Sequence, residues 1–346
     1  HVKDLDPYSF GAVYFPFSYI LMYPFTLMPK VISYFLFLLA WSTFFIYINL
    51  RNLCKNLNTE SVSYLFIFTF LSYPFLFVVD RGNIEMLTFA FTYLFFYSYK
   101  KNYIISLLSL SFAIAMKLFP AVFLLFLIED KKYKEIILTT AAVIFISLVS
   151  MLLLKGDFSS NLSFILRGSD HSQVCCLAAN NNIVQRGVSL FTLAKMYLIQ
   201  TGQIAIFDMA KFLSVYIRIV ISLFILLSGY VIFIEKEFWK KVFLLVSVAL
   251  LFPHASADYK LIYIFIPMFM FINSEKQGRF DLLYTVIFGL LLIPKPYYMF
   301  PKIISDSGYR DIGAGVVINI LLLMAMTGLI IFEGIHNIMD AFKDNQ

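Results

Sequence analysis

The sequence predicts an all-α fold, a polytopic transmembrane helical bundle of about 10–12 membrane segments with one long loop. Two observations carry this prediction. Hydrophobic residues make up 61% of the 346 residues and charged residues only 14%, whereas globular proteins carry about 25% charged residues. The mean hydropathy is +0.83, and 40 Phe and 22 Tyr suit rings that face lipid and hydroxyls that reach the headgroups. A water-soluble fold could not bury this much apolar surface.

The apolar runs mark the membrane segments in order along the chain. Runs that are long enough to span, or nearly so, are 31–50, 61–79, 83–99, 136–154, 211–234 and 313–333. Shorter runs of roughly 11–15 residues are 103–116, 118–128, 240–252, 259–273 and 281–293, whereas a full span needs about 20 residues. The region 103–128 is either one interrupted helix or two short segments, because Pro120 ends or kinks a helix.

The basic residues indicate which connections face the cytoplasm. Under the positive-inside rule, the cytoplasmic connections carry Arg51 and Lys55; Lys100 and Lys101; Lys131, Lys132 and Lys134; Lys236, Lys240 and Lys241; and Lys276 and Arg279. This arrangement requires 103–128 to cross twice, so we favour two short segments with an outer turn at 117–120. The outer side then holds 1–30, 80–83, 117–120, the loop 155–210, 253–258 and 294–312.

We expect one transmembrane domain over residues 1–346, with 155–210 as a long extracytoplasmic loop. The chain opens at His1 in a polar stretch, and we expect a further transmembrane helix upstream of it. The net charge of +6 does not indicate nucleic acid, because Lys and Arg stand singly between apolar runs. Cytoplasmic loops beside anionic lipid explain this charge.

Residues 80–85 form the first polar motif, between two hydrophobic runs. Polar groups at a membrane boundary are costly unless they pair or bind a polar ligand. Asp80 is therefore a candidate catalytic carboxylate, and Arg81, Asn83 and Glu85 are candidate substrate-binding residues. The alternative is a tight hairpin with an Asp80–Arg81 or an Arg81–Glu85 pair. We favour function, because a simple turn does not require Glu85 one turn inside the next helix.

Two further motifs lie on the same expected side. Lys117 either contacts a phosphate as a point charge or extends to the membrane interface. In residues 252–260, His254, Tyr259 and Lys260 are candidate substrate-binding residues and Asp258 is a candidate catalytic residue. An ordinary loop accounts for His254, whereas a carboxylate and an ammonium at the start of an apolar run are harder to explain.

The long loop adds two polar candidates. Asn181 lies in an asparagine run that forms either a turn or a set of amide groups for sugar hydroxyls. Arg186 follows as a candidate phosphate contact. Residues 187–200 then have apolar side chains near helical spacing with Lys195 between them, which predicts an amphipathic helix lying flat at the interface.

Together these residues suit the transfer of a sugar from a phosphate. Such a reaction needs a carboxylate to deprotonate the acceptor hydroxyl and cations to stabilise the phosphate as it leaves. The expected outer side offers the carboxylates Asp80, Glu85 and Asp258 and the cations Arg81, Lys117, Arg186 and Lys260. Tyr14, Tyr19 and Tyr259 add rings that stack on a sugar or cover a polyprenyl chain.

In this order, the motifs resemble those of polyprenol-phosphate-sugar-dependent glycosyltransferases of the GT-C superfamily. The resemblance is closest to glycosyltransferase family 87, which includes polytopic mannosyltransferases. It spans nearly the whole chain and rests on residues 14–16 (YFP), 80–85 (DRGNIE), 117–120 (KLFP), the asparagine-rich stretch before 187–190 (GVSL) and 258–261 (DYKL).

The resemblance implies inverting transfer of a hexose or pentose from a polyprenyl-phosphate donor to a lipid-linked or cell-envelope acceptor on the outer face. It also implies a catalytic acid in the first outer loop. Only Asp4 and Asp6 stand near that position here, and a base upstream of His1 is the alternative.

The expected partners are therefore a polyprenyl-phosphate sugar donor, a lipid-linked or glycan acceptor and membrane lipids. The expected location is a bacterial cytoplasmic (inner) membrane. No cofactor is assigned: carboxylates are available for a divalent cation, but no ligand spacing identifies a metal site.

Two other functions remain open. An O-antigen polymerase or ligase would have a basic outer loop, and loop 155–210 does carry several basic residues. A transporter or flippase of lipid-linked sugars would place ionisable residues near the membrane midplane, often in inverted repeats. Here the polar residues gather near one surface and no repeat is visible, which favours an enzyme.

Overall fold

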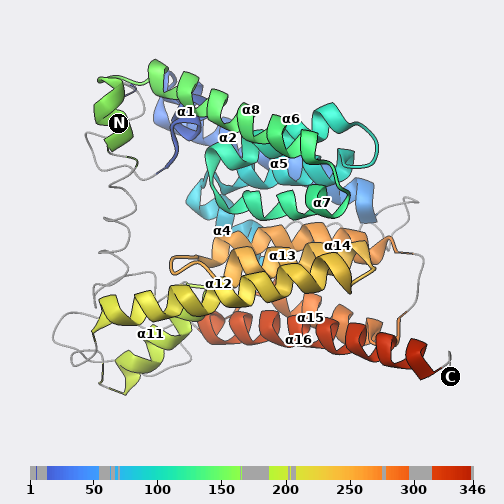
Figure 1. Ribbon diagram of the computed structural model, residues 1–346. Coiled ribbons are helices and arrows are strands. Elements are labelled where there is room, and N and C mark those ends of the chain that lie inside the picture. The colour runs from blue at the N-terminus through green and yellow to red at the C-terminus, as the bar shows by residue number, and fades with distance from the viewer. Residues whose placement is uncertain are drawn as a thin grey trace. The chain divides into compact units, whose positions relative to one another are not determined.

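A computed structural model of the chain describes residues 5, 14–53, 63, 67–68, 71–163, 165, 187–201, 203, 208–274, 278–295 and 314–343. Within these residues the regular secondary structure is helical, and one isolated bridge joins Gly187 to Ala257 (Figure 1). The chain divides into two compact units. Unit 1 comprises His1–Ile48 and Val78–Cys175, and unit 2 comprises Asn49–Phe77 and Cys176–Gln346.

Within the part of the chain that the structure describes, four helices are long and apolar enough to cross a membrane. They are α2 (Lys30–Leu53), α8 (Tyr133–Leu153), α12 (Met209–Phe233) and α16 (Ala314–Lys343). Their large apolar side chains are widely exposed, for example Phe35 at 64%, Phe145 at 67% and Leu226 at 70%. Exposing such surface to water costs free energy, whereas exposing it to lipid does not. The prediction of an all-α polytopic membrane protein is therefore confirmed, and the total of about 10–12 membrane segments stays a prediction.

The shorter helices of unit 1 pack against one another and against α8. They are α1 (Pro16–Thr26), α5 (Glu85–Ser98), α6 (Tyr103–Met116), the 3-10 helix η2 (Phe119–Phe123) and α7 (Leu124–Glu129), while α4 (Tyr73–Arg81) begins in unit 2 and ends in unit 1. Helices α5 and α8 both run against α6 (Figure 1). The side chain of Asn102 caps α6 by accepting a hydrogen bond from the amide of Ile105 at 3.2 Å.

The chain reverses direction at residues 117–120, as predicted. Helix α6 ends at Met116, Lys117 has extended backbone, and Pro120 lies in the first turn of η2. The hydroxyl of Tyr99, just before α6, donates to the carbonyl of Phe126 and to Asp130, both at 2.9 Å. The end of α7 therefore returns to the start of α6, and 103–128 is two segments.

Unit 2 contains α11 (Leu190–Gln200), α13 (Phe238–Leu251), the 3-10 helix η4 (Asp258–Ile264), α14 (Phe265–Ile272) and α15 (Asp281–Leu292), besides α12 and α16. A buried polar network joins three of these helices. Glu333 of α16 accepts hydrogen bonds from Lys240 of α13 at 2.8 Å and from Tyr284 of α15 at 2.5 Å.

This network corrects one expectation about the connections. The sequence analysis placed Lys240 and Lys241 in a cytoplasmic connection, but α13 already begins at Phe238 and both lysines are buried inside it. Ion pairs of Lys240 with Glu237 and Glu333 make this burial possible.

A third lysine, Lys195, is also buried against expectation. The predicted amphipathic segment does form α11, but Lys195 is only 2% exposed and does not lie on a polar outer face.

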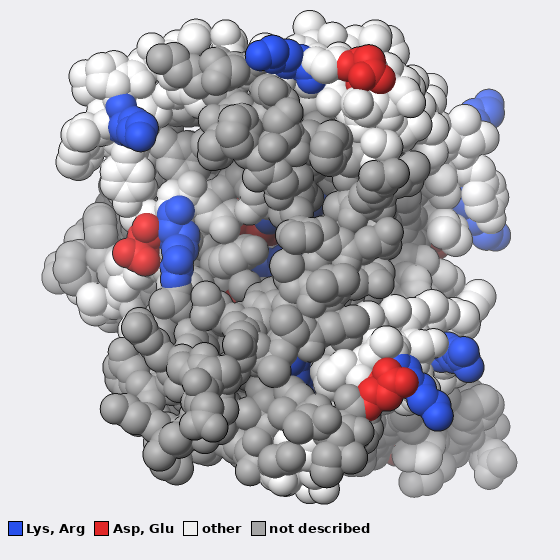
Figure 2. Space-filling model, turned by 90° about the vertical axis from the view of Figure 1, so that its left-hand side faces the viewer, with Lys and Arg blue, Asp and Glu red and all other residues white. Residues whose placement is uncertain are grey.

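The described surface carries scattered charge. Figure 2 shows Lys and Arg side chains singly or in small groups, some beside Asp or Glu, among uncharged residues on the face it presents. This distribution agrees with isolated basic connections rather than with a continuous basic patch.

Candidate functional site

Residues 80–85 comprise the end of α4, the turn after it and the first residue of α5. Gly82 has φ +52°, and a Cβ added to it would lie 3.3 Å from the ring of Tyr34. Glycine therefore suits this position for both its backbone and its close contact. Asn83 accepts a hydrogen bond from the amide of Glu85 at 3.0 Å, at the start of α5. Asp80 and Arg81 form an exposed ion pair at 3.9 Å, one of the two pairs considered from the sequence.

Glu85 pairs with Lys117, and the sequence analysis missed this partner. The side chain of Glu85 is fully buried and that of Lys117 is 12% exposed. The end of α6 and its extended C-cap bring Lys117 to Glu85 at the first turn of α5. The ammonium also lies 5.2 Å from the centre of the Tyr14 ring. A buried charge of this kind requires a partner, so each residue here fixes the other.

A pocket of about 500 Å³ opens in unit 1 beside this pair. It is lined by α1, the start of α2 and the turn before α5, through Tyr14, Ser18, Tyr19, Met22, Phe25, Thr26, Met28, Lys30, Ser33, Tyr34, Phe37, Arg81, Gly82, Asn83 and Ile84. The amide of Tyr14 donates to the hydroxyl of Tyr19 at 2.8 Å, and the hydroxyl of Ser18 donates to the carbonyl of Met116 at 3.1 Å. These bonds hold in place the part of the pocket wall that Tyr14 and α1 form.

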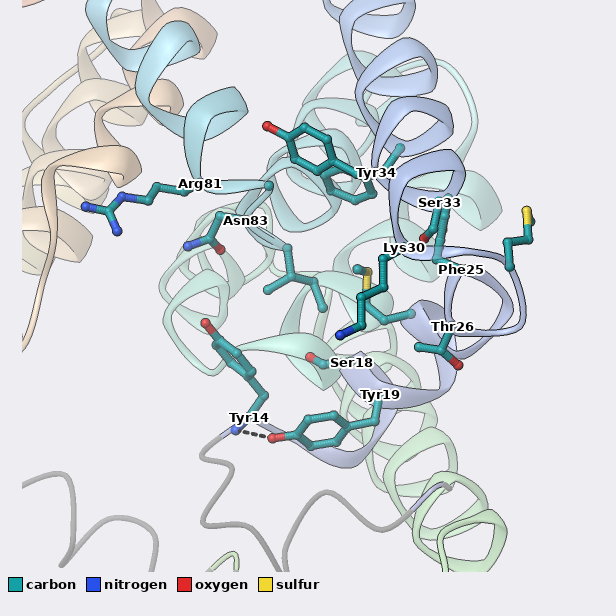
Figure 3. A pocket seen from close by; sticks show the side chains of 15 residues that line it. Tyr14, Ser18, Tyr19, Phe25, Thr26, Lys30, Ser33, Tyr34, Arg81 and Asn83 are labelled. Atoms are coloured by element: carbon teal, nitrogen blue, oxygen red, sulfur yellow. Dashed lines mark hydrogen bonds between the residues drawn. The ribbon is translucent and has the colours of Figure 1, made fainter. Parts of the chain in front are cut away.

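Figure 3 shows how the two cations of this pocket differ. The ammonium of Lys30 points into the pocket toward Ser18, whereas the guanidinium of Arg81 points away from it. Lys30 was not a candidate from the sequence. The sequence feature that could have identified Lys30 is its place at the expected outer end of a spanning helix, where the positive-inside rule does not place a basic residue.

Unit 2 holds the other described candidates around Asp258, the first residue of η4. This carboxylate is 5% exposed and accepts a hydrogen bond from the hydroxyl of Tyr73. The ring of Tyr73 stacks on Phe77 at 5.6 Å, and Phe77 stacks on Tyr259 at 6.4 Å. The three aromatic rings therefore form one stack, which orients the Tyr73 hydroxyl that binds the carboxylate.

His254 lies on the loop that leads to Asp258. Burial lowers the pKa of its imidazole, and the charge of Lys260 lowers it further. The ring packs edge-on against Phe191 at 6.4 Å. The amide of Val188 donates to the carbonyl of Ser256 at 2.8 Å, so the end of the long loop is attached to this segment. Because its pKa is lowered, the His254 imidazole is neutral at neutral pH.

Lys295 is a second residue that sequence reasoning missed. Burial lowers the pKa of its ammonium to about 8, and the negative charge of Asp258 opposes this decrease. Its ammonium donates to the carbonyls of Leu290 at 2.6 Å and Ile293 at 3.1 Å, at the end of α15. The sequence offered only a lysine between two prolines, with no sign of a distant carboxylate.

The structure therefore distributes the candidates over two units. Unit 1 holds Asp80, Arg81, Asn83, Glu85 and Lys117, and unit 2 holds His254, Asp258, Tyr259 and Lys260. Asp4, Asp6, Asn181 and Arg186 lie outside the described residues. Among the residues that the structure describes, no group of three or more His, Cys, Asp or Glu could hold a metal ion.

Comparison with known proteins identifies the family. A model of glycosyltransferase family 87 matches residues 12–253, which is more than half of the chain. This match covers the pocket of unit 1 and the Glu85–Lys117 pair, and it ends just before His254. Comparisons with the curated proteins and with the solved structures found no match.

Proposed function

This chain belongs to glycosyltransferase family 87, and from this premise we propose which sugar transfer it performs. The donor is a polyprenyl-phosphate hexose or pentose, and the acceptor is a lipid-linked or cell-envelope glycan. Transfer takes place with inversion on the outer face of a bacterial cytoplasmic membrane. The residues 1–346 act as one transmembrane domain, with 155–210 as an extracytoplasmic loop.

The observation that carries this proposal is the environment of Asp258. Its carboxylate is buried, bound by the Tyr73 hydroxyl and electrostatically coupled to Lys295. Asp80, by contrast, has a side chain that is 77% exposed. A general base must hold a fixed position within hydrogen-bond reach of the proton it removes. Among the described carboxylates, Asp258 meets this requirement better than Asp80.

The reaction then balances as one displacement. The acceptor hydroxyl oxygen attacks the anomeric carbon and gives its proton to the carboxylate. The bond between that carbon and the phosphate oxygen breaks, and polyprenyl phosphate leaves with the electron pair. Lys260 and Lys295 supply positive charge for the leaving phosphate, and neutral His254 offers a hydrogen bond to a sugar hydroxyl.

The other candidates keep subsidiary roles in this proposal. Tyr259 stacks on a sugar, and Asn181 and Arg186 contribute from the long loop. Arg81, Asn83, Glu85 and Lys117 of unit 1 stay candidate substrate contacts predicted from the sequence. Asp4 and Asp6 remain alternative bases, because the family resemblance points to the first outer loop.

The direct test uses membranes that contain the full-length protein. Labelled polyprenyl-phosphate hexoses and pentoses are supplied with lipid acceptors, and the glycosylated lipid is measured. We expect transfer by the wild-type protein and a large loss of transfer for D258N. D208N, a matched change at the exposed N-cap of α12, should cause no loss. Flipping of a lipid-linked sugar without transfer to any acceptor contradicts the proposal.

A labelling experiment tests the outer face. Single cysteines are introduced as R81C, L118C and A257C after Cys54, Cys175 and Cys176 are changed to Ser. Leu118 is 66% exposed and is therefore open to reagent. We expect an impermeant thiol reagent to modify these positions from outside the cell. Modification only from the cytoplasmic side overturns the topology.

A further inference from the structure

A short backbone bridge inside unit 2 joins the end of the long loop to the segment 252–258. Gly187 and Ala257 form an antiparallel bridge, and the amide of Val188 donates to the carbonyl of Ser256 at 2.8 Å. Gly187, Val188 and Ser256 are all buried, so water does not compete for this hydrogen bond. The bridge therefore attaches the loop to the segment that carries the proposed catalytic carboxylate.

The bridge has no room for a side chain at position 187. A Cβ added to Gly187 would lie 2.7 Å from the Cβ of Thr192 and still closer to both γ atoms of that side chain. Rotation of the Thr192 side chain moves its γ atoms but not its Cβ, which belongs to the first turn of α11. Ser189 holds this turn, because its hydroxyl accepts from the amide of Thr192 at 3.1 Å and lies 2.9 Å from the Thr192 hydroxyl. A side chain at position 187 must therefore displace either the bridge or the start of α11.

A tyrosine of α12 holds the same segment at its other end. The hydroxyl of Tyr216 donates a hydrogen bond that the carbonyls of Phe252 and Leu251 share, at 2.8 and 3.2 Å. These carbonyls stand at the end of α13, where a helix leaves its last carbonyls without a partner of its own. The ring of Phe191 packs against Tyr216 at 5.1 Å and against His254 at 6.4 Å. Contacts from α11 and α12 therefore hold the chain on both sides of His254.

We propose that Gly187 and Tyr216 are positioning residues, which fix the backbone of 252–258 and thereby the side chains of His254 and Asp258. These roles rest on the proposed function, which makes Asp258 the base. Neither residue contacts the substrate; each acts through the backbone that it holds. A shift of about 1 Å in a catalytic group reduces a rate by up to about 10²-fold, so this attachment matters for transfer.

The test combines amide hydrogen exchange with turnover of a labelled donor, both on the full-length protein. G187A should increase exchange at Val188 and in 252–258, because the added methyl group separates the bridge from α11. It should also reduce kcat by about tenfold to a hundredfold, with a smaller change in KM. T192G removes the obstructing side chain, so G187A/T192G should match T192G alone in both exchange and kcat. This rescue distinguishes the steric effect at position 187 from a general loss of structure.

Matched substitutions elsewhere in unit 2 control this experiment. G229A makes the same change inside α12, where nothing lies within 4 Å of the added Cβ, and should behave as the wild type does. Y216F tests the second attachment without adding volume, and should reduce kcat by about fivefold to tenfold through the lost hydrogen bond. Y197F is its control, because Tyr197 is an exposed residue of α11.

The two readouts separate this proposal from the proposed function. Increased exchange and reduced kcat in G187A, both reversed in G187A/T192G, support the positioning role. Wild-type exchange in G187A overturns it, and so does increased exchange with wild-type kcat. If G187A does not fold, Y216F decides, and a wild-type kcat in Y216F overturns the proposal. A wild-type protein that transfers no sugar contradicts the proposed function, while exchange in G187A still decides whether Gly187 fixes 252–258.

Discussion

The hydroxyl of Tyr73 donates a hydrogen bond to the carboxylate of Asp258, 185 residues further along the chain. This bond joins α4 to the first residue of η4 inside unit 2. It holds a buried carboxylate in one orientation, and an ionised carboxylate accepts hydrogen bonds only, as a general base requires.

We predict that D258N reduces the rate of sugar transfer by about 10²–10⁴-fold, because an amide cannot accept the proton. Y73F should reduce it by about tenfold, since the carboxylate keeps its charge but loses a hydrogen bond. Turnover with a labelled donor in membranes measures both effects. Y197F is the matched control, because Tyr197 is 61% exposed on α11. Wild-type turnover in D258N would exclude Asp258 as the base.

The rate of transfer should fall as the pH rises through about 8. Burial lowers the pKa of Lys295 to about this value, so its positive charge beside Asp258 is lost above it. His254 titrates below its ordinary pKa of 6.5 and does not contribute to the alkaline decrease. K295R should shift the decrease to higher pH, because arginine keeps its charge. A pH–rate profile measures this.

The control for this profile is K211M, which removes an exposed lysine of α12. K211M should keep the wild-type profile, whereas K295M should be slow and lack the decrease near pH 8. An unchanged alkaline decrease in K295M would assign it to another group.

The Glu85–Lys117 pair should contribute strongly to stability. Either E85Q or K117M removes the ion-pair partner of a charge in a buried pair, which costs about 3–5 kcal/mol. The double variant should recover part of this loss, since no charge is then left behind. Denaturant unfolding in detergent measures the free energy of unfolding of each variant.

K132M provides the comparison for a solvent-exposed lysine. The Lys132–Asp130 pair is 38% and 39% exposed, and such pairs contribute about 0–1 kcal/mol. Equal losses of stability in K117M and K132M would show that the Glu85–Lys117 pair is not buried.

Replacement of Gly82 should destabilise the turn between α4 and α5. G82A forces a side chain into a left-handed backbone conformation, which costs about 1–2 kcal/mol, and brings Cβ to 3.3 Å from Tyr34. G289A is the control, because Gly289 lies inside α15 with open space around it and alanine favours a helix. Thermal unfolding should show a lower Tm for G82A only. Equal Tm values would contradict the strained turn.

The sequence by itself determined the fold class and much of the chain's organisation. Apolar runs at 31–50, 136–154, 211–234 and 313–333 became the four long helices, because lipid requires each span to satisfy its own backbone hydrogen bonds. The reversal at 117–120 was also predictable, since Pro120 and the distribution of basic residues both required a break. The motif order led to the family that the comparison then identified.

Only the tertiary structure decided which polar residues meet. Local sequence gave Glu85 an expected partner in Arg81, but its partner is Lys117, 32 residues away. Likewise, Asp258 meets Tyr73, and Lys240 is buried on Glu333 of another helix. Such pairs form because packed helices bury charges and polar groups, which then require partners within the protein. Helical periodicity and charge counts describe one segment at a time, so they place a residue at a helix end without showing what lies opposite it.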